Sequence, residues 1–144
     1  MICPDVNVLL YAMRKDSVRH SAYAEWLRGV MVGHEPVGVS ELVLSAVVRL
    51  STNHRIYREP NSAAEALDFC QAIRNAPAAI PLRPGPRHWD IFTRLCQESN
   101  ATANVVPDAY HAALAVENDA TWITNDRGFA RFPNLQSRPP FKIA

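Results

Sequence analysis

The stretch MICPDVNVLLYA, residues 1–12, sets the expected fold of this chain. It begins as a short apolar strand and continues as a helix, and Asp5 lies near the end of the strand. Burying a carboxylate in such an apolar run is costly unless a partner compensates its charge. Asn7 adds a second polar group two residues further on. The stretch therefore predicts a strand–helix unit with a polar site at its junction.

The same alternation of strand and helix continues along the chain. Apolar spacing predicts helices over 17–32, 41–53, 61–76 and 86–100 and from Pro107, and short strands over 36–40, 78–82 and 120–124. In the helix 41–53, the residues predicted to face inward are Leu42, Val43, Ala46, Val47 and Leu50. Ser17 is a candidate N-cap, and Ser62 with Glu65 forms a capping-box pattern. A short helical turn, GFARF, follows Asp126, and a last strand is expected near Leu135. Alternating strands and helices predict a mostly parallel sheet covered on both faces.

Length and composition limit the class of protein. A chain of 144 residues that is 48% hydrophobic fits one domain, residues 1–144, with a substantial core. It contains no run long and apolar enough for a transmembrane helix, and its first basic residue follows the first apolar run, unlike a signal peptide. Three cysteines, Cys3, Cys70 and Cys96, are an odd number without close spacing. They predict reduced thiols and a cytoplasmic protein.

The basic residues are mostly arginine. The net charge is +1, and 13 of the 15 basic residues are Arg. The rigid guanidinium fork suits phosphate and carboxylate groups. If four of the 14 acids gather in one site, the remaining surface is mildly basic. That arrangement suits a metal-dependent enzyme acting on a polyanion, although a solvated surface of mixed charge is an alternative.

Four acids from distant segments share a position relative to the predicted elements. Asp5 and Asp126 follow strands, and Glu41 and Asp108 open helices. In open α/β sheets, ligands bind beyond the carboxyl ends of the strands. Helix dipoles would explain Glu41 and Asp108 individually, and a turn would explain Asp126. One cause for all four is a hard divalent cation, Mg²⁺ or Mn²⁺, which neutralises clustered carboxylates.

Five segments in order carry a family resemblance: PDVNVLLYA, SELVLSAVVRLSTNHRIY, PGPRHW, VVPDAYHAALAVE and WITNDRGFARFPNL. Over nearly its whole length the chain resembles the PIN-domain ribonucleases, and more closely the VapC toxins of type II toxin–antitoxin pairs. The resemblance implies a three-layer α/β/α sandwich around a short, mostly parallel sheet of four or five strands. It also implies Mg²⁺- or Mn²⁺-dependent hydrolysis of RNA phosphodiesters, with tRNA or rRNA as the substrate.

The resemblance assigns roles to individual residues. The aspartate of the family's first strand matches Asp5, that of its D-A-x-x-A-A-L-A-x-E motif matches Asp108, and that of its T-x-D motif matches Asp126. These three would bind the metal. Thr124 and Asn7 match the supporting hydroxyl and amide positions.

The chain departs from the family pattern at two places. Many relatives carry the second acid in the middle of the third helix, near Ser45 and Ala46, whereas this chain offers Glu41 about one turn earlier. Glu41 is therefore expected to complete the catalytic set of Asp5, Asp108 and Asp126. Relatives often carry a further acid where this chain has Gly128, so a second metal would be weakly held.

Arginines near these acids are candidates for RNA contact. We expect contacts from Arg49, Arg87 and Arg127, since a group of arginines can cover a phosphate backbone. Neighbouring arginines that could add to them are Arg55, Arg58, Arg83 and Arg131. Ordinary solvation explains any one exposed arginine equally well. His111 lies three residues after Asp108 and could border the site as a proton acceptor.

The resemblance also implies partners. A cognate VapB-type antitoxin would lay a helix or tail into a groove between helices 17–32 and 41–53, unless those faces are simply core. A homodimer in the bacterial cytoplasm is expected, without membrane association.

Two other functions are alternatives to the ribonuclease. A phosphatase with an aspartate nucleophile would need a second acid where Asn7 lies and a nearby lysine, and only Lys15 and Lys142 exist. A non-catalytic PIN-like domain that binds RNA or a partner remains an alternative, because a fold does not guarantee an activity.

Overall fold

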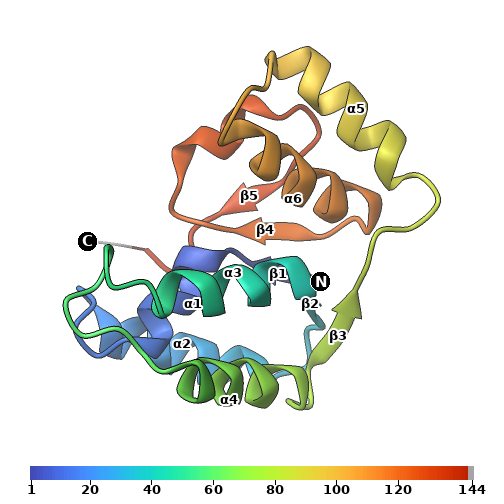
Figure 1. The fold of residues 1–144 in the computed structure, drawn as a ribbon. Coiled ribbons are helices and arrows are strands. Elements are labelled where there is room, and N and C mark those ends of the chain that lie inside the picture. Colours follow the sequence, from blue (N-terminus) through green and yellow to red (C-terminus); the bar gives the residue numbers. More distant parts are fainter. Residues whose placement is uncertain (143–144) are drawn as a thin grey trace.

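The computed structural model describes residues 1–142 and contains a five-stranded sheet in the order β3-β2-β1-β4-β5 (Figure 1). The strands are β1 (Ile2–Pro4), β2 (Val37–Ser40), β3 (Ala79–Leu82), β4 (Thr121–Ile123) and β5 (Ser137–Arg138). Every neighbouring pair is parallel. The predicted α/β class, with a parallel sheet of four or five strands, is confirmed.

The helices fall into two packed groups. They are α1 (Val6–Met13), α2 (His20–Met31), α3 (Glu41–Ser51), α4 (Ala63–Arg74), α5 (His88–Ser99) and α6 (Val105–Glu117), with a 3₁₀ helix η1 (Arg127–Arg131). α1 packs against α2 and α3, and α3 against α4, whereas α5 and α6 pack against each other beside β4 and β5 (Figure 1). The first two crossovers step one way across the sheet and the third steps back, so right-handed connections place the two groups on opposite faces. This is the expected three-layer sandwich.

The central strands form because their side chains are apolar on both faces. All residues of β1 and β2 are buried, as expected where helices cover a parallel sheet. Gly38 in β2 is required by close packing, since a Cβ there would lie 2.8 Å from Cys3 Sγ on β1. Strand β3 lies at the edge, where Ile80 is 40% exposed and Pro81 needs no ladder donor.

Helix starts agree with the sequence where a local hydrogen bond defines them. Ser62 and Glu65 form the predicted capping box, with reciprocal bonds of 3.0 and 3.1 Å. The predicted N-cap at Ser17 is wrong, because the Ser17 carbonyl accepts the His20 N–H (3.2 Å) in a turn and α2 begins only at His20. Helix α6 begins at Val105 rather than Pro107, which a proline in the first turn permits.

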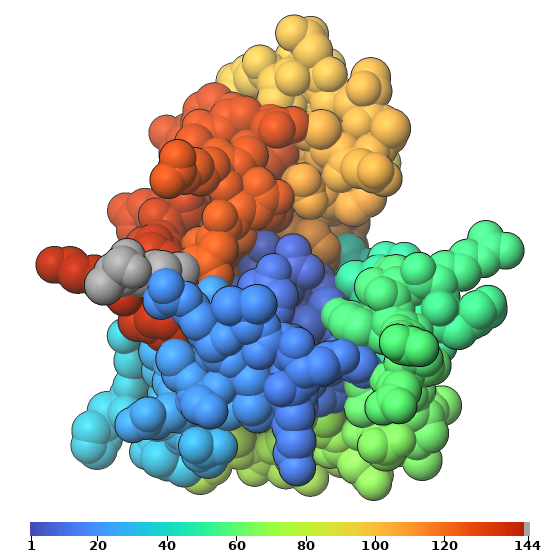
Figure 2. All heavy atoms as spheres, turned by 90° about the vertical axis from the view of Figure 1, so that its left-hand side faces the viewer, coloured from blue at the N-terminus to red at the C-terminus, as the bar shows by residue number. Residues whose placement is uncertain are grey.

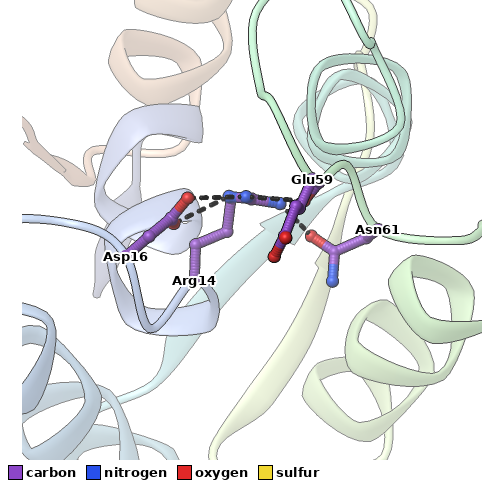
Figure 3. A network of polar contacts seen from close by, with 4 residues as sticks. All are labelled: Arg14, Asp16, Glu59 and Asn61. Carbon is purple, nitrogen blue, oxygen red and sulfur yellow. Dashed lines mark hydrogen bonds and ion pairs between the residues drawn. The ribbon is translucent and has the colours of Figure 1, made fainter.

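A buried arginine ties the end of α1 to the segment that precedes α4. The Arg14 guanidinium donates to both carboxylate oxygens of Asp16 (3.0 and 2.8 Å), to Asn61 Oδ1 (2.7 Å) and to the Glu59 carbonyl (3.0 Å) (Figure 3). It also lies 3.7 Å from the ring centre of Tyr57. Asp16 and three groups from residues 57–61 thus share one cation. In residues 1–142, no helix has the length and apolar character needed to cross a membrane.

Candidate active site

Two of the predicted aspartates meet because their strands are parallel neighbours. Asp5 follows β1, Asp126 follows the β4 strand by three residues, and Pro4 lies in register with Ile123. Asp5 caps α1 and Asp126 caps η1. The sheet therefore delivers both side chains to the same carboxyl edge, as expected for a ligand site in this class of fold.

Thr124 connects these two aspartates. Its Oγ1 donates to Asp5 Oδ2 (2.6 Å) and accepts from the Asp126 backbone N–H (3.0 Å). The other Asp5 oxygen accepts from the Val6 N–H (2.6 Å). Asp5 is 7% and Thr124 5% exposed. Burial and two hydrogen bonds thus fix the orientation of the Asp5 carboxylate, and a third bond holds Thr124.

Asp108 completes a cavity of about 190 Å³ that also contains Asp5 and Asp126. Asp108 lies in the first turn of α6. The rest of the cavity wall comes mainly from α1, α3 and α6 and includes Asn7, Ala46, Arg49, Leu50 and His111. Figure 2 looks at this edge of the molecule, where blue atoms of the N-terminal segment meet the orange C-terminal segment near the centre. Three carboxylates, from the segments that follow β1 and β4 and from α6, therefore share one small, open space.

The electrostatics of the cavity reflect crowded negative charge. Burial, together with the charges of Asp126 and Asp5, raises the pKa of Asp108 to about 6 against an opposing effect of Arg131. Burial also raises the pKa of Asp5, although the hydrogen bonds from Thr124 and Val6 oppose the rise. The ionised forms of Asp5 and Asp108 are thus less stable here than in water, and a bound cation would stabilise them.

The residues present fit a hydrated divalent cation better than a fully protein-ligated one. Carboxylate oxygens are the ligands that Mg²⁺ and Mn²⁺ prefer. Across residues 1–142, no group of three or more His, Cys, Asp or Glu side chains is arranged as a ready-made metal site. The oxygens of Asp5 and Asp126 instead accept protein donors, including the Gly128 N–H (2.8 Å). Mg²⁺ commonly keeps several waters and uses one or two carboxylates, which matches this donor set.

Two further polar residues border the cavity. Asn7 is exposed in the first turn of α1. His111 is 7% exposed, its ring stacks on Trp122 (5.4 Å between centroids), and its Nδ1 has no partner among the described residues. Burial lowers the pKa of His111 to about 4, so the ring is neutral at physiological pH. His111 borders the site as expected.

The structure does not bring Glu41 to this cavity. Its carboxylate lies 3.4 Å from Arg74 Nη1 and 3.9 Å from Arg83 Nε, on the side of α3 that faces α4 and β3. The residues of α3 that line the cavity are Ala46, Arg49 and Leu50. Because each residue advances about 100° around a helix, Glu41 and Ala46 point in different directions. The geometry therefore removes Glu41 from the candidate site and leaves an alanine where the helix approaches the aspartates.

The three candidate RNA-binding arginines differ in position. Arg49 lines the cavity and Arg127 follows Asp126 directly. Arg87 lies at the other end of α6, where its backbone N–H donates to the Glu117 carboxylate (2.9 Å) and its Nη2 donates to the Glu117 carbonyl (3.0 Å). Nine residues of helix separate Glu117 from Asp108, or roughly 14 Å. Arg87 is therefore not part of this site.

The sequence predicts Arg131 only as one of several arginines near the acids, whereas the structure gives it a specific position beside Gly128. Its Nε donates to the Gly128 carbonyl (2.8 Å), and its charge lowers the pKa of Asp108. A Cβ at Gly128 would lie 2.9 Å from Asp126 Oδ1 and 3.0 Å from Arg131 Nη2. The sequence signal for this position of Arg131 was the short helical turn GFARF, because a 3₁₀ turn brings residue 131 close to residue 128.

Comparison with known proteins identifies relatives of this chain. A family model described as the PIN domain matches residues 2–135. Ribonuclease VapC43 of Mycobacterium tuberculosis is 45% identical over 140 residues, which cover 97% of the chain and 95% of VapC43. Ribonuclease VapC25 of the same organism is 38% identical over 141 residues, 97% of the chain and 99% of VapC25.

Solved structures share the fold at low sequence identity. VapBC-1 from nontypeable Haemophilus influenzae matches with a TM-score of 0.69 at 15% identity, covering 99% of the chain and 100% of the matched chain. VapBC2 from Rickettsia felis, bound to a DNA fragment from its promoter, matches with a TM-score of 0.68 at 18% identity, covering 96% and 98%. At these identities the likeness concerns the fold alone.

Proposed function

The chain belongs to the PIN domain family, and on that premise we propose that it is an Mg²⁺- or Mn²⁺-dependent endoribonuclease, the toxin of a toxin–antitoxin pair. The observation that carries the proposal is the single cavity lined by Asp5, Asp108 and Asp126 at the carboxyl edge of the sheet. It occurs in a chain that is 45% identical to a protein named as a VapC ribonuclease.

The chain's own side chains provide position and charge for phosphodiester hydrolysis. When bound, a divalent cation lowers the pKa of a water ligand and neutralises charge on phosphate oxygens. Asp5 and Asp108 would hold it, partly through water, and Asp126 would orient the attacking water. Thr124 keeps the Asp5 carboxylate in place through its 2.6 Å hydrogen bond, as supporting residues around metal ligands commonly do. Asn7 offers an amide at the cavity mouth.

The substrate of this site would be exposed, single-stranded RNA. The cavity is small, so a base-paired duplex could not enter it, whereas an unpaired loop can place one phosphate over the aspartates. Arg49 and Arg127 flank the aspartates and would contact neighbouring phosphates. Loops of tRNA or rRNA present this kind of target.

Replacement of one aspartate tests the activity. The antitoxin-free protein should cleave RNA when Mn²⁺ is added, and Asp5→Asn should lose at least about a hundredfold in rate, since it removes the charge from a buried position. Glu41→Gln is the matched control and should cleave normally. Melting curves verify that both variants are folded. Metal-dependent cleavage by Asp5→Asn at the wild-type rate would refute the assignment.

A non-catalytic, RNA- or partner-binding PIN-like domain is the second candidate. It is favoured by the absence of a ready-made metal site within residues 1–142 and by the position of Glu41 outside the cavity. Such a domain would bind RNA equally well with and without Mn²⁺ and would leave it intact. Cleavage that needs Mn²⁺ and Asp5 discriminates between the two.

The proposed partners are a VapB-type antitoxin and a second copy of the chain. Exposed apolar side chains suit an antitoxin, since Val18 and Val32 flank α2 and are 83% and 70% exposed, and Leu42 on α3 is 43% exposed. The groove predicted between helices 17–32 and 41–53 has α1 within it, because α1 packs against both α2 and α3. A solution mass of twice 16.1 kDa by light scattering would support the homodimer.

We also propose a cytoplasmic location. In the described part of the chain, Cys3, Cys70 and Cys96 are free thiols, which suits a reducing compartment.

A further inference from the structure

A second, larger hollow adjoins the cavity of the three aspartates. It has a volume of about 710 Å³, against about 190 Å³ for the cavity. It lies beyond the carboxyl end of β4, with walls from the start of η1 and from Ser137 of β5. Asp126 borders both spaces. A ligand in the hollow would therefore lie directly beside any chemical group bound in the cavity of the three aspartates.

Polar groups without protein partners converge on this hollow. The side chains of Arg127 and Ser137 line it, and neither makes a hydrogen bond or ion pair with any residue of the described range 1–142. Asn125 donates from its amide nitrogen to the Tyr23 hydroxyl, which fixes the amide and leaves its carbonyl oxygen free. A cation, a hydroxyl and a carbonyl acceptor are thus available to one ligand.

The distribution of these groups suits a nucleotide. Among the described residues that line the hollow, Arg127 is the cation and Asp126 the acid. An anionic group would therefore bind at Arg127, and a neutral group with both donors and acceptors would suit Asn125 and Ser137. The volume falls in the range of roughly 300–1,000 Å³ that is usual for sites of small organic ligands. A phosphate joined to a base has this combination of charge and hydrogen-bonding capacity.

We propose that the hollow binds one unstacked nucleotide of single-stranded RNA, with its phosphate on Arg127 and its base against Asn125 and Ser137. This inference rests on the proposed ribonuclease function and adds to it a second contact beside the cleaved phosphodiester. Because Asn125 and Ser137 offer hydrogen bonds to a base edge, the hollow would make cleavage depend on the nucleotide next to the scissile bond.

The first test fills the hollow without changing the aspartates. Ala130 lies on η1, is exposed and lines the hollow, so Ala130→Trp would occupy the space of the nucleotide. The probe is a short, fluorescein-labelled single-stranded RNA of random sequence, whose binding is measured by anisotropy in EDTA. Ala130→Trp should weaken binding about tenfold or more, equivalent to 1.4 kcal/mol. Ala64→Trp, at an exposed position of α4, controls for an added surface tryptophan and should bind normally.

The second test measures the proposed phosphate contact. Removing one phosphate contact to a single strand should reduce the slope of log affinity against log salt by about 0.7. Arg127→Ala should show this change, whereas Arg94→Ala, an exposed arginine of α5, should retain the wild-type slope. Melting temperatures establish that each variant is folded. Ala130→Trp and Arg127→Ala change different residues of the hollow, so the two tests are independent.

The outcomes separate this inference from the function on which it rests. Wild-type protein that cleaves RNA, with Ala130→Trp and Arg127→Ala binding the probe as tightly and with the same salt slope, would overturn the nucleotide site alone. Wild-type protein that neither binds the probe nor cleaves RNA with Mn²⁺ would overturn both. Weaker binding by Ala130→Trp and a reduced slope for Arg127→Ala, with unchanged controls, is the expected result.

Discussion

At the scale of single residues, Thr124 has a role that its position in the T-x-D motif only suggests. Its hydroxyl is both donor to Asp5 and acceptor for the Asp126 N–H. Thr124→Val should therefore lose about 1–3 kcal/mol of unfolding free energy, because it leaves buried polar groups unpaired. The acid limb of the pH–rate profile should also move to higher pH, since the Thr124 hydrogen bond lowers the pKa of Asp5.

Chemical denaturation and pH–rate measurements check this prediction. Thr124→Ser keeps the hydroxyl and should resemble the wild type in both measurements. Equal stability and equal pH profiles for the valine and serine variants would mean that the hydroxyl does not orient Asp5.

Asp108 should make stability depend on pH. Its folded-state pKa of about 6 lies above the ordinary aspartate value of 3.8, so the folded protein binds this proton more tightly than the unfolded chain. The resulting stabilisation is fully present below the unfolded pKa and is lost as pH rises through about 6. Melting temperatures in metal-free buffer should fall over this window, and Asp108→Asn should reduce the fall. The same pH dependence in both proteins would exclude Asp108 as its source.

The sequence located most site residues because each lies at the end of a strand or in the first turn of a helix. Asp5, Asp108, Asp126 and Asn7 line the cavity, and Thr124 lies beside it. The position of Arg87 could not be predicted in this way, because its distance from the aspartates depends on how α5 packs along α6.

At the scale of elements, the rotation of helix α3 about its own axis explains why Glu41 lies outside the cavity in which the sequence predicted it. The sequence predicted Leu42 on the inward face, whereas Leu42 is 43% exposed and Leu44 is buried. Apolar residues occupy most of this helix, so periodicity gives its rotation about its axis only weakly. The true rotation is set by packing against α1 and α4.

The rotation of α3 leads to a prediction with two variants. Glu41→Gln should leave Mn²⁺ affinity and RNA cleavage within about twofold of wild type, as for most surface substitutions. Ala46→Asp should add a carboxylate to the cavity wall and increase Mn²⁺ affinity. Calorimetric titration measures both. Loss of Mn²⁺ binding in Glu41→Gln together with no gain in Ala46→Asp would contradict the placement of this helix.

Strand β2 provides a test of packing at the sheet. Gly38→Ala would place a methyl group 2.8 Å from Cys3 Sγ and about 3.0 Å from Leu82 Cδ2, so we expect a loss of about 1–3 kcal/mol in unfolding free energy. Gly29→Ala in α2 is the matched control, since nothing lies within 4 Å of the added atom. There alanine should stabilise the helix by about 0.5–1 kcal/mol. Urea unfolding measures both, and equal effects would contradict the packing described for β2.

The start of a helix could be predicted from the sequence where hydrogen bonds between residues close in sequence define it. The Ser62 box is such a case, since both partners lie within three residues. The start of α2 could not be predicted in this way. Residues 17–19 form a turn, and His20, which follows it, also bonds to the Tyr11 carbonyl (2.9 Å) near the end of α1. Contacts of this kind depend on the tertiary arrangement.

At the scale of the whole molecule, strand order determines the site. β1 and β4 are adjacent although more than 100 residues separate Asp5 from Thr124, and α6 enters from the other helix group. The alternation of strands and helices predicted a parallel sheet but not the order of its strands, because that order depends on the direction in which each crossover steps across the sheet. The order β3-β2-β1-β4-β5 places Asp5 and Asp126 just beyond the ends of neighbouring strands, and so it brings separate acids to a shared cavity.

The most direct test of that shared cavity is calorimetric titration of Mn²⁺ into the metal-free, antitoxin-free protein. We predict saturable binding by the wild type, weakened at least about tenfold in Asp5→Asn, Asp108→Asn and Asp126→Asn and unchanged in Glu41→Gln. Wild-type protein that takes up no Mn²⁺, or aspartate variants that bind it as tightly as the wild type, would contradict the account.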